Sequence, residues 1–237
     1  IAAFNANGAM PHYQATPARH LEITGNGLLL IDSGGQYLGG TTDITRVVPV
    51  GQVSDEQRHD FTVVLKGMIA LSQAHFPKGV PGPMIDAIAR APLWQAGVDF
   101  GHGTGHGVGY FMNVHEGPQS ISPRRQFGPE AAMLPGMITS NEPGLYRPGK
   151  WGIRIENLVL AVPAASTGFG EFLKFETLTL CPIDTRCIDV NRLTPTEVNW
   201  LNAYHQQVLD RLLPLTQGAA REWLIARTQA LQAVSGQ

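Results

Sequence analysis

Cysteine is scarce in this sequence, which has only Cys181 and Cys187 among its 237 residues. Two cysteines in a chain of this length exclude a disulfide framework and favour a reducing compartment. Long apolar runs are missing as well, because a stretch such as LLLI at 28–31 is far too short to cross a bilayer. We therefore expect a cytoplasmic protein that has no membrane partner.

An excess of charge of either sign is also missing. The 17 Lys and Arg residues are balanced by 19 Asp and Glu residues, so the formal net charge is -2. No basic run or stripe stands out, and the sequence therefore predicts no nucleic-acid partner. The chain opens on Ile1 rather than Met, and we expect residues 1–237 to be one domain from the C-terminal part of a longer protein.

Apolar spacing predicts an α+β domain. Strand patterns are present at 27–51, where glycine pairs indicate a hairpin, and again at 137–147, 152–162 and 174–183. Helical spacing predicts a helix over 54–76 that stops at Pro77, a shorter helix over 83–97 and a pair of terminal helices over 194–234. The TPTE motif that begins at Thr194 predicts a capping box at the start of that pair.

Glycine is concentrated in one stretch, DFGHGTGHGVGYFMNVHEGP at 99–118, which also holds His102, His106 and His115. Glycine at this density lets the main chain approach another group closely, or adopt dihedral angles that a Cβ forbids. A histidine kept only for packing does not require such neighbours. The stretch therefore predicts the wall of a site, and its spacing does not fit a dinucleotide-binding fingerprint.

Two aspartates mark the first predicted hairpin. Asp32 ends the apolar run LLLID, where a buried carboxylate needs a partner, and Asp43 follows at the start of the next strand. If the hairpin folds near Tyr37 and Leu38, these two side chains face each other across the strands. Like charges in that position destabilise a hairpin unless a cation lies between them.

Two glutamates repeat this arrangement. Glu142 and Glu156 are equidistant in sequence from Gly149, which lies in the middle of the turn sequence RPGKW. A hairpin centred on that glycine places the two carboxylates opposite each other. The two hairpins, joined by one histidine of the glycine-rich stretch, predict a cage of four carboxylates and an imidazole.

This set of ligands suits a hard or borderline divalent cation, with Mn²⁺, Zn²⁺ and Co²⁺ all admissible. Four negative charges overload a single ion, so we expect two ions, an arrangement that suits hydrolysis. The simpler alternative is that each acid is solvated or forms an ordinary ion pair with Arg46 or Arg154. Either acid pair alone leaves that alternative open, whereas both pairs and the histidines together favour the metal site.

Four motifs carry a resemblance to a known family. They are DSGGQYLGGTTDITR (32–46), HGTGHGVGYFMNVHEGP (102–118), SNEPGLY (140–146) and GIRIEN (152–157). In their order and spacing, they resemble the catalytic domain of the Xaa-Pro aminopeptidases (aminopeptidase P), in the long, cytosolic-type branch. The resemblance implies a pita-bread fold, with two pseudo-symmetric αβ halves around a central antiparallel sheet. Relatives in this branch often form dimers, and the terminal helices are rich in aliphatic and tryptophan residues, so we expect a homodimer formed through the C-terminal region. The alternative is that both helices only pack on the sheet.

The metal ligands of that family fall on five positions that match here. The resemblance implies that Asp32 holds a first ion and that His106 and Glu142 hold a second. Asp43 and Glu156 would bridge the two ions. Glu142 would also accept a proton from the attacking water.

Other matching positions are implied to serve the reaction without holding metal. His12, His102 and His115 would line the substrate cleft and stabilise or shuttle protons for the tetrahedral intermediate. Arg154 and Tyr146 would form a pair that supports Asp32.

The implied function is hydrolysis of peptides with proline at the second position, which releases the N-terminal residue with the help of two divalent ions, first of all Mn²⁺. Such peptides are the implied partners. Gly101, on the predicted substrate rim, stands where relatives carry arginine. Three alternatives stay open: prolidase, a dipeptidase on the same fold; a non-catalytic module that binds histones, RNA or partner proteins; and a metal-binding structural domain without turnover.

Overall fold

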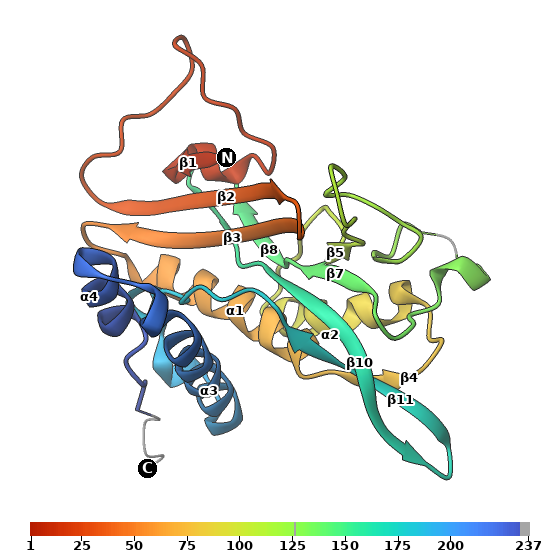
Figure 1. Ribbon diagram of the computed structural model, residues 1–237. Coiled ribbons are helices and arrows are strands. Elements are labelled where there is room, and N and C mark those ends of the chain that lie inside the picture. Colours follow the sequence, from red (N-terminus) through yellow and green to blue (C-terminus); the bar gives the residue numbers. More distant parts are fainter. Residues whose placement is uncertain (126, 233–237) are drawn as a thin grey trace.

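The computed structural model describes residues 1–125 and 127–232 and has the mixed helix and strand content of the predicted α+β class (Figure 1). The first antiparallel sheet has the order β1-β2-β3, with β1 (Ala2–Phe4), β2 (Gly27–Tyr37) and β3 (Gly40–Val50). The second has the order β4-β11-β10-β7, with β4 (His75–Pro77), β11 (Gly170–Thr177), β10 (Asn157–Thr167) and β7 (Ile138–Asn141). Two short ladders pair β5 (Gly105–His106) with β6 (Ser120–Ile121), and β8 (Gly144–Arg147) with β9 (Trp151–Arg154).

Helices pack against these sheets and bury two hydrophobic cores. They are α1 (Asp55–Ser72), α2 (Gly82–Gln95), α3 (Pro195–Leu212) and α4 (Gly218–Arg227). One core joins the first sheet, α1, the β8–β9 ladder and α3, and the other joins α2 to the second sheet. Helix α1 contributes to both cores, through Phe61 to the first and Leu71 to the second. It therefore ties the two parts of the fold together behind the strands (Figure 1).

The first hairpin forms where it was predicted, but its register differs. Tyr37 pairs with Gly40, so the turn lies one residue later than expected and Asp32 stands opposite Thr45 rather than Asp43. Gly40 has φ +151°, a conformation that glycine adopts without strain, and this places the two-residue turn at 38–39. The expected facing pair of aspartates is therefore wrong. Since the partners shift by two residues, both carboxylates still lie on the same face of the sheet.

The second hairpin has the predicted register. Gly144 pairs with Arg154 and Asn141 pairs with Asn157, so the same register holds on both sides of Glu142 and Glu156. Gly149, with φ +76°, forms the turn as expected. Each predicted strand is nevertheless divided in two, into β7 and β8 on one side and β9 and β10 on the other. The two glutamates lie at these breaks, where the chain passes between sheets.

Two predicted boundaries are wrong for reasons of tertiary packing. Helix α1 ends at Ser72, five residues before Pro77, because His75–Pro77 form the edge strand β4 and Phe76 is buried there against Phe175. The strand predicted over 174–183 is β11, which ends at Thr177. Residues 178–183 leave the ladder and pass beside α3, where Thr179 and Cys181 accept from Tyr204. Helix α2 agrees with its prediction to within two residues.

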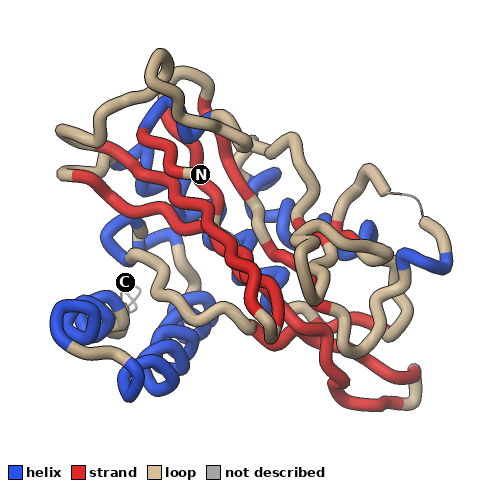
Figure 2. The backbone as a smooth tube through the Cα atoms, turned by 45° about the horizontal axis from the view of Figure 1, so that its top comes forward, coloured by secondary structure: helices blue, strands red, loops and turns tan. Residues whose placement is uncertain are grey.

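The C-terminal helices begin as predicted. Thr194 accepts from the backbone N–H of Glu197, and the Glu197 side chain closes the capping box of α3. Helix α4 ends at Arg227, earlier than expected, and residues 233–234 of the predicted span lie outside the described residues. Both helices lie together on one side of the molecule (Figure 2). Helix α4 leaves Trp223 and Ile225 partly exposed. A homodimer through this region stays a prediction, which sedimentation of the full-length protein would test.

No helix of the described residues is long and apolar enough to act as a membrane span.

Candidate metal centre and substrate cleft

The structure brings the four acids and one histidine into a single cluster. One potential ligand atom from each of Asp32, Asp43 and Glu156 lies within 4.8 Å of the others, and the same holds for His106, Glu142 and Glu156. Glu156 belongs to both groups. Two adjacent sets of three ligand atoms that share a carboxylate have the composition that a pair of divalent cations requires.

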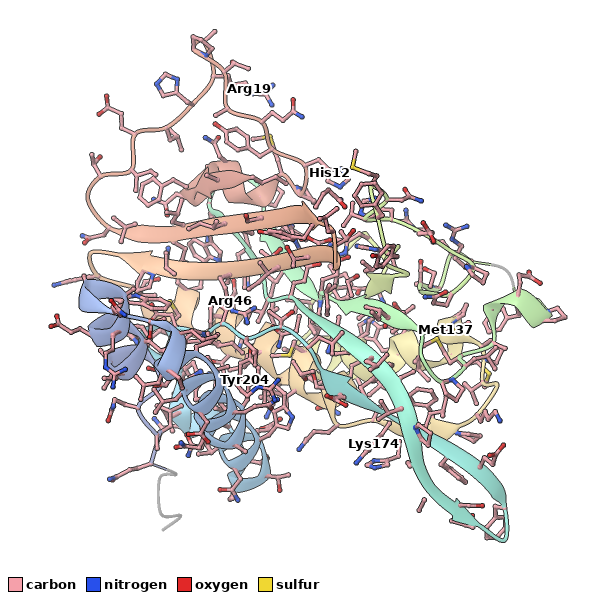
Figure 3. The ribbon with its side chains drawn as sticks, viewed as in Figure 1. His12, Arg19, Arg46, Met137, Lys174 and Tyr204 are labelled. Atoms are coloured by element: carbon pink, nitrogen blue, oxygen red, sulfur yellow. The ribbon has the colours of Figure 1, made fainter. Side chains whose placement is uncertain are left out.

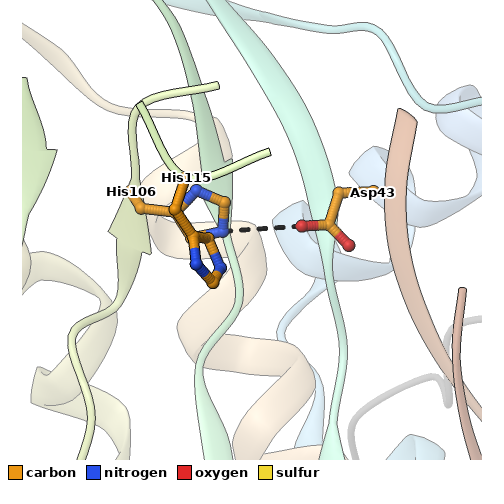
Figure 4. A group of neighbouring side chains, drawn as sticks. All are labelled: Asp43, His106 and His115. Atoms are coloured by element: carbon orange, nitrogen blue, oxygen red, sulfur yellow. Dashed lines mark ion pairs between the residues drawn. The ribbon is translucent and has the colours of Figure 1, made fainter. Parts of the chain in front are cut away.

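His106 is oriented toward the acids. Its Nε2 lies 3.5 Å from an oxygen of Asp43 (Figure 4). The same nitrogen lies 3.4 Å from an oxygen of Glu142. Its Nδ1 lies 3.0 Å from the carbonyl oxygen of Gly107, which can only accept, so the neutral ring carries its proton on Nδ1. The Nε2 lone pair then points into the cluster. This is the arrangement by which a second hydrogen bond fixes the tautomer of a metal-ligating histidine.

Arg154 connects the two halves of the cluster. Its Nη2 donates to Asp32 Oδ2 at 2.6 Å and its Nε donates to the hydroxyl of Thr45 at 3.1 Å. That hydroxyl in turn donates to Glu156 Oε2 at 2.6 Å. The expected contact of Arg154 with Asp32 is therefore present, and the same arginine also orients Glu156 through Thr45.

The electrostatics of the cluster are those of crowded carboxylates with no cation between them. Burial and the charge of Glu156 raise the pKa of Glu142 to about 8. Burial and the charge of Asp43 raise the pKa of Glu156 to about 8 as well. For His106, burial lowers the pKa, but the hydrogen bond to Asp43 and the charge of Glu142 outweigh it, and the pKa is raised. Each of these shifts opposes the accumulated negative charge, so the donor set fits divalent cations.

These shifts predict that cation binding releases protons. At pH 7 the metal-free protein keeps much of Glu142 and Glu156 protonated, whereas a bound ion requires both carboxylates ionised. We expect Mn²⁺ affinity to rise between pH 6 and about 8 and then to level off, with roughly one to two protons released at pH 7. Titration calorimetry in buffers of different ionisation enthalpy measures this number. A pH-independent affinity without proton release would contradict the burial of these two carboxylates.

The glycines of 99–118 are required by close contacts of the main chain. A Cβ on Gly105 would lie 1.9 Å from the carbonyl oxygen of Ser140, and one on Gly107 would lie 2.0 Å from the carbonyl oxygen of Glu116. Only glycine lets His106 come this close to strand β7 and the cluster. The sequence-based interpretation of this stretch as the wall of a site agrees with this geometry.

Helix α2 holds the beginning of the same stretch. Arg90 donates to the carbonyl oxygen of Phe100 at 2.8 Å and to that of His102 at 2.6 Å. Asp86 pairs with Arg90 and accepts two hydrogen bonds from Thr104, from its N–H and its hydroxyl. This buried pair therefore fixes the backbone on either side of His102.

His102 lies beside the cluster with both ring nitrogens engaged. Nδ1 lies 2.7 Å from the carbonyl oxygen of Gly103, so it carries the proton, and Nε2 accepts from the Tyr146 hydroxyl at 2.7 Å. Tyr146 itself accepts from Arg154 at 3.0 Å. Burial lowers the pKa of His102 to about 4. These contacts favour a positioning role for His102 over the proton-shuttling role that the resemblance implies.

A cleft of about 1220 Å³ opens over the cluster and is lined by His12, His102 and His115 as well as the five candidate ligands. The rings of His115 and His106 are 4.1 Å apart, nearly perpendicular (Figure 4). His115 also lies within 4.8 Å of both Asp43 and His106 by potential ligand atoms. Gly101 lines the cleft too, and a Cβ there would meet nothing within 4 Å, so an arginine would have room at this position.

Several residues that shape the site were not predicted. Thr45, Ser140, Asp86 and Arg90 hold the candidate ligands or the glycine-rich backbone, through partners up to 111 residues away in sequence. Thr45 lies within the quoted motif TTDITR, two residues after Asp43 and so on the same face of its strand. That alternation was the available signal for Thr45.

The family of the chain follows from a comparison with known proteins. Residues 1–163 match the model of metallopeptidase family M24, and residues 171–231 match the C-terminal region of peptidase M24. The chain belongs to metallopeptidase family M24. The pita-bread fold implied by the sequence motifs is that of this family and is confirmed.

The relatives within the M24 family include Xaa-Pro aminopeptidases. The chain is 48% identical over 236 residues to aminopeptidase P2 of Arabidopsis thaliana. This alignment covers 98% of the chain and 33% of the relative. It is 46% identical to a probable Xaa-Pro aminopeptidase P of Laccaria bicolor, over 94% of this chain and 36% of the relative. The predicted resemblance to the Xaa-Pro aminopeptidases is confirmed. The chain spans about a third of the length of these relatives.

Solved structures similar to the chain include an X-prolyl aminopeptidase and a prolidase. The crystal structure of the cytosolic X-prolyl aminopeptidase of Caenorhabditis elegans, described as having a di-nuclear active site, matches with TM-score 0.89 and 38% identity. This match covers 98% of this chain and 38% of the C. elegans chain. A prolidase of Thermococcus sibiricus matches with TM-score 0.59 and 36% identity, over 68% of this chain and 41% of the prolidase.

Proposed function

We propose that this M24 chain hydrolyses peptides with proline at the second position and releases their N-terminal residue, using two divalent metal ions. The observation that carries the proposal is the cluster of four carboxylates and the Nε2 of His106 at the base of the cleft. The relatives named above support the choice of substrate. The closer match to an X-prolyl aminopeptidase than to a prolidase favours it over dipeptide hydrolysis.

The metal ligands proposed are the five that the sequence motifs imply. Asp32 would hold the first ion, His106 and Glu142 the second, and Asp43 and Glu156 both. Ions held there would supply Lewis-acid chemistry, lowering the pKa of a water and polarising a carbonyl group. Mn²⁺ is our preferred ion, and the all-oxygen ligands of the first site suit it.

The protein's own groups would orient the substrate and move protons. His115, on the cleft wall next to His106, is placed to donate a hydrogen bond to an oxyanion. Glu142, held by the Ser140 hydroxyl at 3.0 Å, would accept the proton that the attacking water loses. The hydrogen bonds that run from Asp32 through Arg154 and Tyr146 to His102 would fix these four side chains in one orientation.

The proposal predicts a clear substrate preference. Full-length protein reconstituted with Mn²⁺ is expected to cleave a tripeptide Xaa-Pro-Xaa efficiently. We expect the matched Xaa-Ala-Xaa tripeptide and the dipeptide Xaa-Pro to be cleaved at least about 10²-fold less efficiently by kcat/KM, a factor of the size that pocket contacts supply. Preference for the dipeptide would make the protein a prolidase. Metal binding without cleavage of any of the three would leave a structural metal domain, and absence of both would leave a binding module.

The cytoplasm is the location that we propose for this activity. Cys181 and Cys187 are both free thiols, which suits a reducing compartment. Fractionation of cells with an antibody against the full-length protein would test this location.

A further inference from the structure

Arg46 is a buried arginine that lies on the face of β3 opposite to Thr45 and Asp43, away from the metal centre. It is 8% exposed. Its guanidinium nitrogens lie within hydrogen-bond distance of six oxygen atoms, so its five N–H groups are all engaged and two acceptors of Nη2 share one of them. The acceptors are the carbonyls of Thr45 (3.0 Å), Glu156 (2.6 Å), Cys181 (2.8 Å) and Pro182 (3.1 Å), the side-chain amide oxygen of Asn157 (2.7 Å) and the hydroxyl of Tyr204 (3.0 Å). Among the described residues it forms no ion pair with a carboxylate.

Apart from Thr45 on its own strand, the acceptors of Arg46 belong to three separate parts of the fold. Glu156 and Asn157 mark the start of β10, Cys181 and Pro182 lie in the segment after β11, and Tyr204 lies on α3. Figure 3 labels Arg46 and Tyr204, which lie between the β2–β3 hairpin and α3. The second and third parts fall within the C-terminal region of the family, residues 171–231.

Glu156 is held from both sides of its peptide backbone. Its carbonyl accepts from Arg46 and its N–H donates to the carbonyl of Thr45 at 3.1 Å. Its side chain accepts from the Thr45 hydroxyl at 2.6 Å. The position of this carboxylate relative to Asp32 and Asp43 therefore depends on how residues 156–157 are bound to β3, and Arg46 contributes to that binding together with Thr45.

Tyr204 completes the arrangement from the C-terminal helix. Its hydroxyl is buried, accepts from Arg46, and lies 2.8 Å and 3.0 Å from the carbonyl oxygens of Cys181 and Thr179. Trp200 stacks on the ring at 5.4 Å. Only a guanidinium offers five N–H groups in a planar fork, so a lysine at position 46 could satisfy at most three of these acceptors.

We infer that Arg46 and Tyr204 are positioning residues for the metal centre, through which the C-terminal region holds the bridging carboxylate of Glu156 in place. The inference rests on the proposed metal-dependent function. Neither residue is among those that line the cleft. Arg46 acts through the backbone of Glu156 and the side chain of Asn157, and Tyr204 acts through Arg46. Helix α3 then supports the position of a metal ligand, in addition to packing on the hydrophobic core.

The inference predicts that Arg46→Lys and Tyr204→Phe weaken metal binding without unfolding the protein. In the full-length protein, we expect Mn²⁺ affinity to fall by about 10–100-fold in each variant, the usual range for a group that orients a metal ligand. Calorimetric titration of the metal-free protein with Mn²⁺ gives the affinity and the number of ions, and thermal unfolding of the same sample reports stability. Arg147→Lys is the matched control, because Arg147 pairs with Asp60 and has no contact with the cluster.

The outcomes separate this inference from the proposed function. Weakened binding in folded Tyr204→Phe, with binding unchanged in Arg147→Lys, supports the inference even if Arg46→Lys does not fold. Wild-type affinity in folded Tyr204→Phe overturns it and leaves the proposed function intact. Equal weakening in Arg147→Lys also overturns it, since general destabilisation would then be the cause. If the wild-type protein binds no Mn²⁺, the proposed function fails and the inference fails with it.

Discussion

Replacement of Glu156 by Gln is expected to abolish peptide hydrolysis while the protein stays folded. Glu156 is shared by the two groups of potential ligands that would hold the two ions, Asp32 with Asp43 and His106 with Glu142, so the amide removes one negative charge from both ions at once. We expect kcat to fall by on the order of 10³-fold or more, since stabilisation of developing charge is a large contribution to catalysis. Metal analysis by mass spectrometry should show that fewer than two ions remain bound. Asp43→Asn is expected to behave in the same way.

Without metal, the Glu156→Gln variant should lack the pH dependence of stability that the Glu156 carboxyl group gives to the wild type. Because the pKa of Glu156 in the folded protein is raised to about 8, its stabilising contribution is present below its ordinary pKa and is lost as pH rises through about 8. Glutamine does not titrate, and its amide oxygen can still accept from Thr45. Thermal unfolding should therefore give similar stabilities for the metal-free wild type and the variant near pH 4.5, and a variant that becomes progressively more stable than the wild type as the pH rises to about 8.

Glu171→Gln is the control for a lost carboxylate, because Glu171 is an exposed residue of β11 that pairs with Lys78. It should retain full activity and both ions. A large loss of metal-free stability in Glu156→Gln at pH 7 would mean that this carboxylate is structural. Full activity in the same variant would remove it from the proposed centre.

The two hairpins show what the sequence could and could not predict. The register of the second hairpin was predicted correctly because RPGKW has one glycine at its centre, Gly149, that can take the positive φ of the turn. The first hairpin has two adjacent glycines, Gly39 and Gly40, and either could have ended the turn. The error moved the partner of Asp32 by two residues, which preserves its face of the sheet. The candidate cluster therefore survived a wrong register.

Long-range contacts account for most of what was missed. The periodicity of α1 continues past Ser72, but pairing with β11 takes His75–Pro77 into a sheet, and no local signal reports that partner. From the sequence, Arg46 is expected only to form an ion pair with a carboxylate. Its acceptors in the structure are neutral oxygens up to 158 residues away in sequence. A buried arginine and an exposed one look alike in a single sequence.

Replacement of each of the three histidines of the glycine-rich stretch by alanine is expected to have a different effect on metal content and on kcat. His106→Ala removes the imidazole that points at Asp43 and Glu142, so it should lower both metal content and activity. His115→Ala should leave both ions bound and lower kcat for Xaa-Pro-Xaa peptides by about 10²–10⁴-fold, the usual effect of losing an acid–base or oxyanion group. Metal content and steady-state kinetics of the full-length protein measure both effects.

His102 is expected to act through Tyr146, because its Nε2 is engaged by the tyrosine hydroxyl and its Nδ1 by a carbonyl. We expect His102→Ala to lower kcat by only about 10–100-fold. Combined with Tyr146→Phe, it should cost little more than either change alone, since both variants break the same hydrogen bond. Additive losses would instead assign His102 an independent contact with the substrate.

His75→Ala is the matched control for these variants, because His75 is exposed on the edge strand β4, outside the cleft. It should keep wild-type kinetics and metal content. The decisive comparison is between His106 and His115, whose rings touch and whose nitrogens both lie near Asp43. If His115→Ala lost metal while His106→Ala kept it, His115 would be the ligand and His106 the cleft residue. The Nδ1 contact of His106 with Gly107, which directs its Nε2 at the acids, is the reason to expect the reverse.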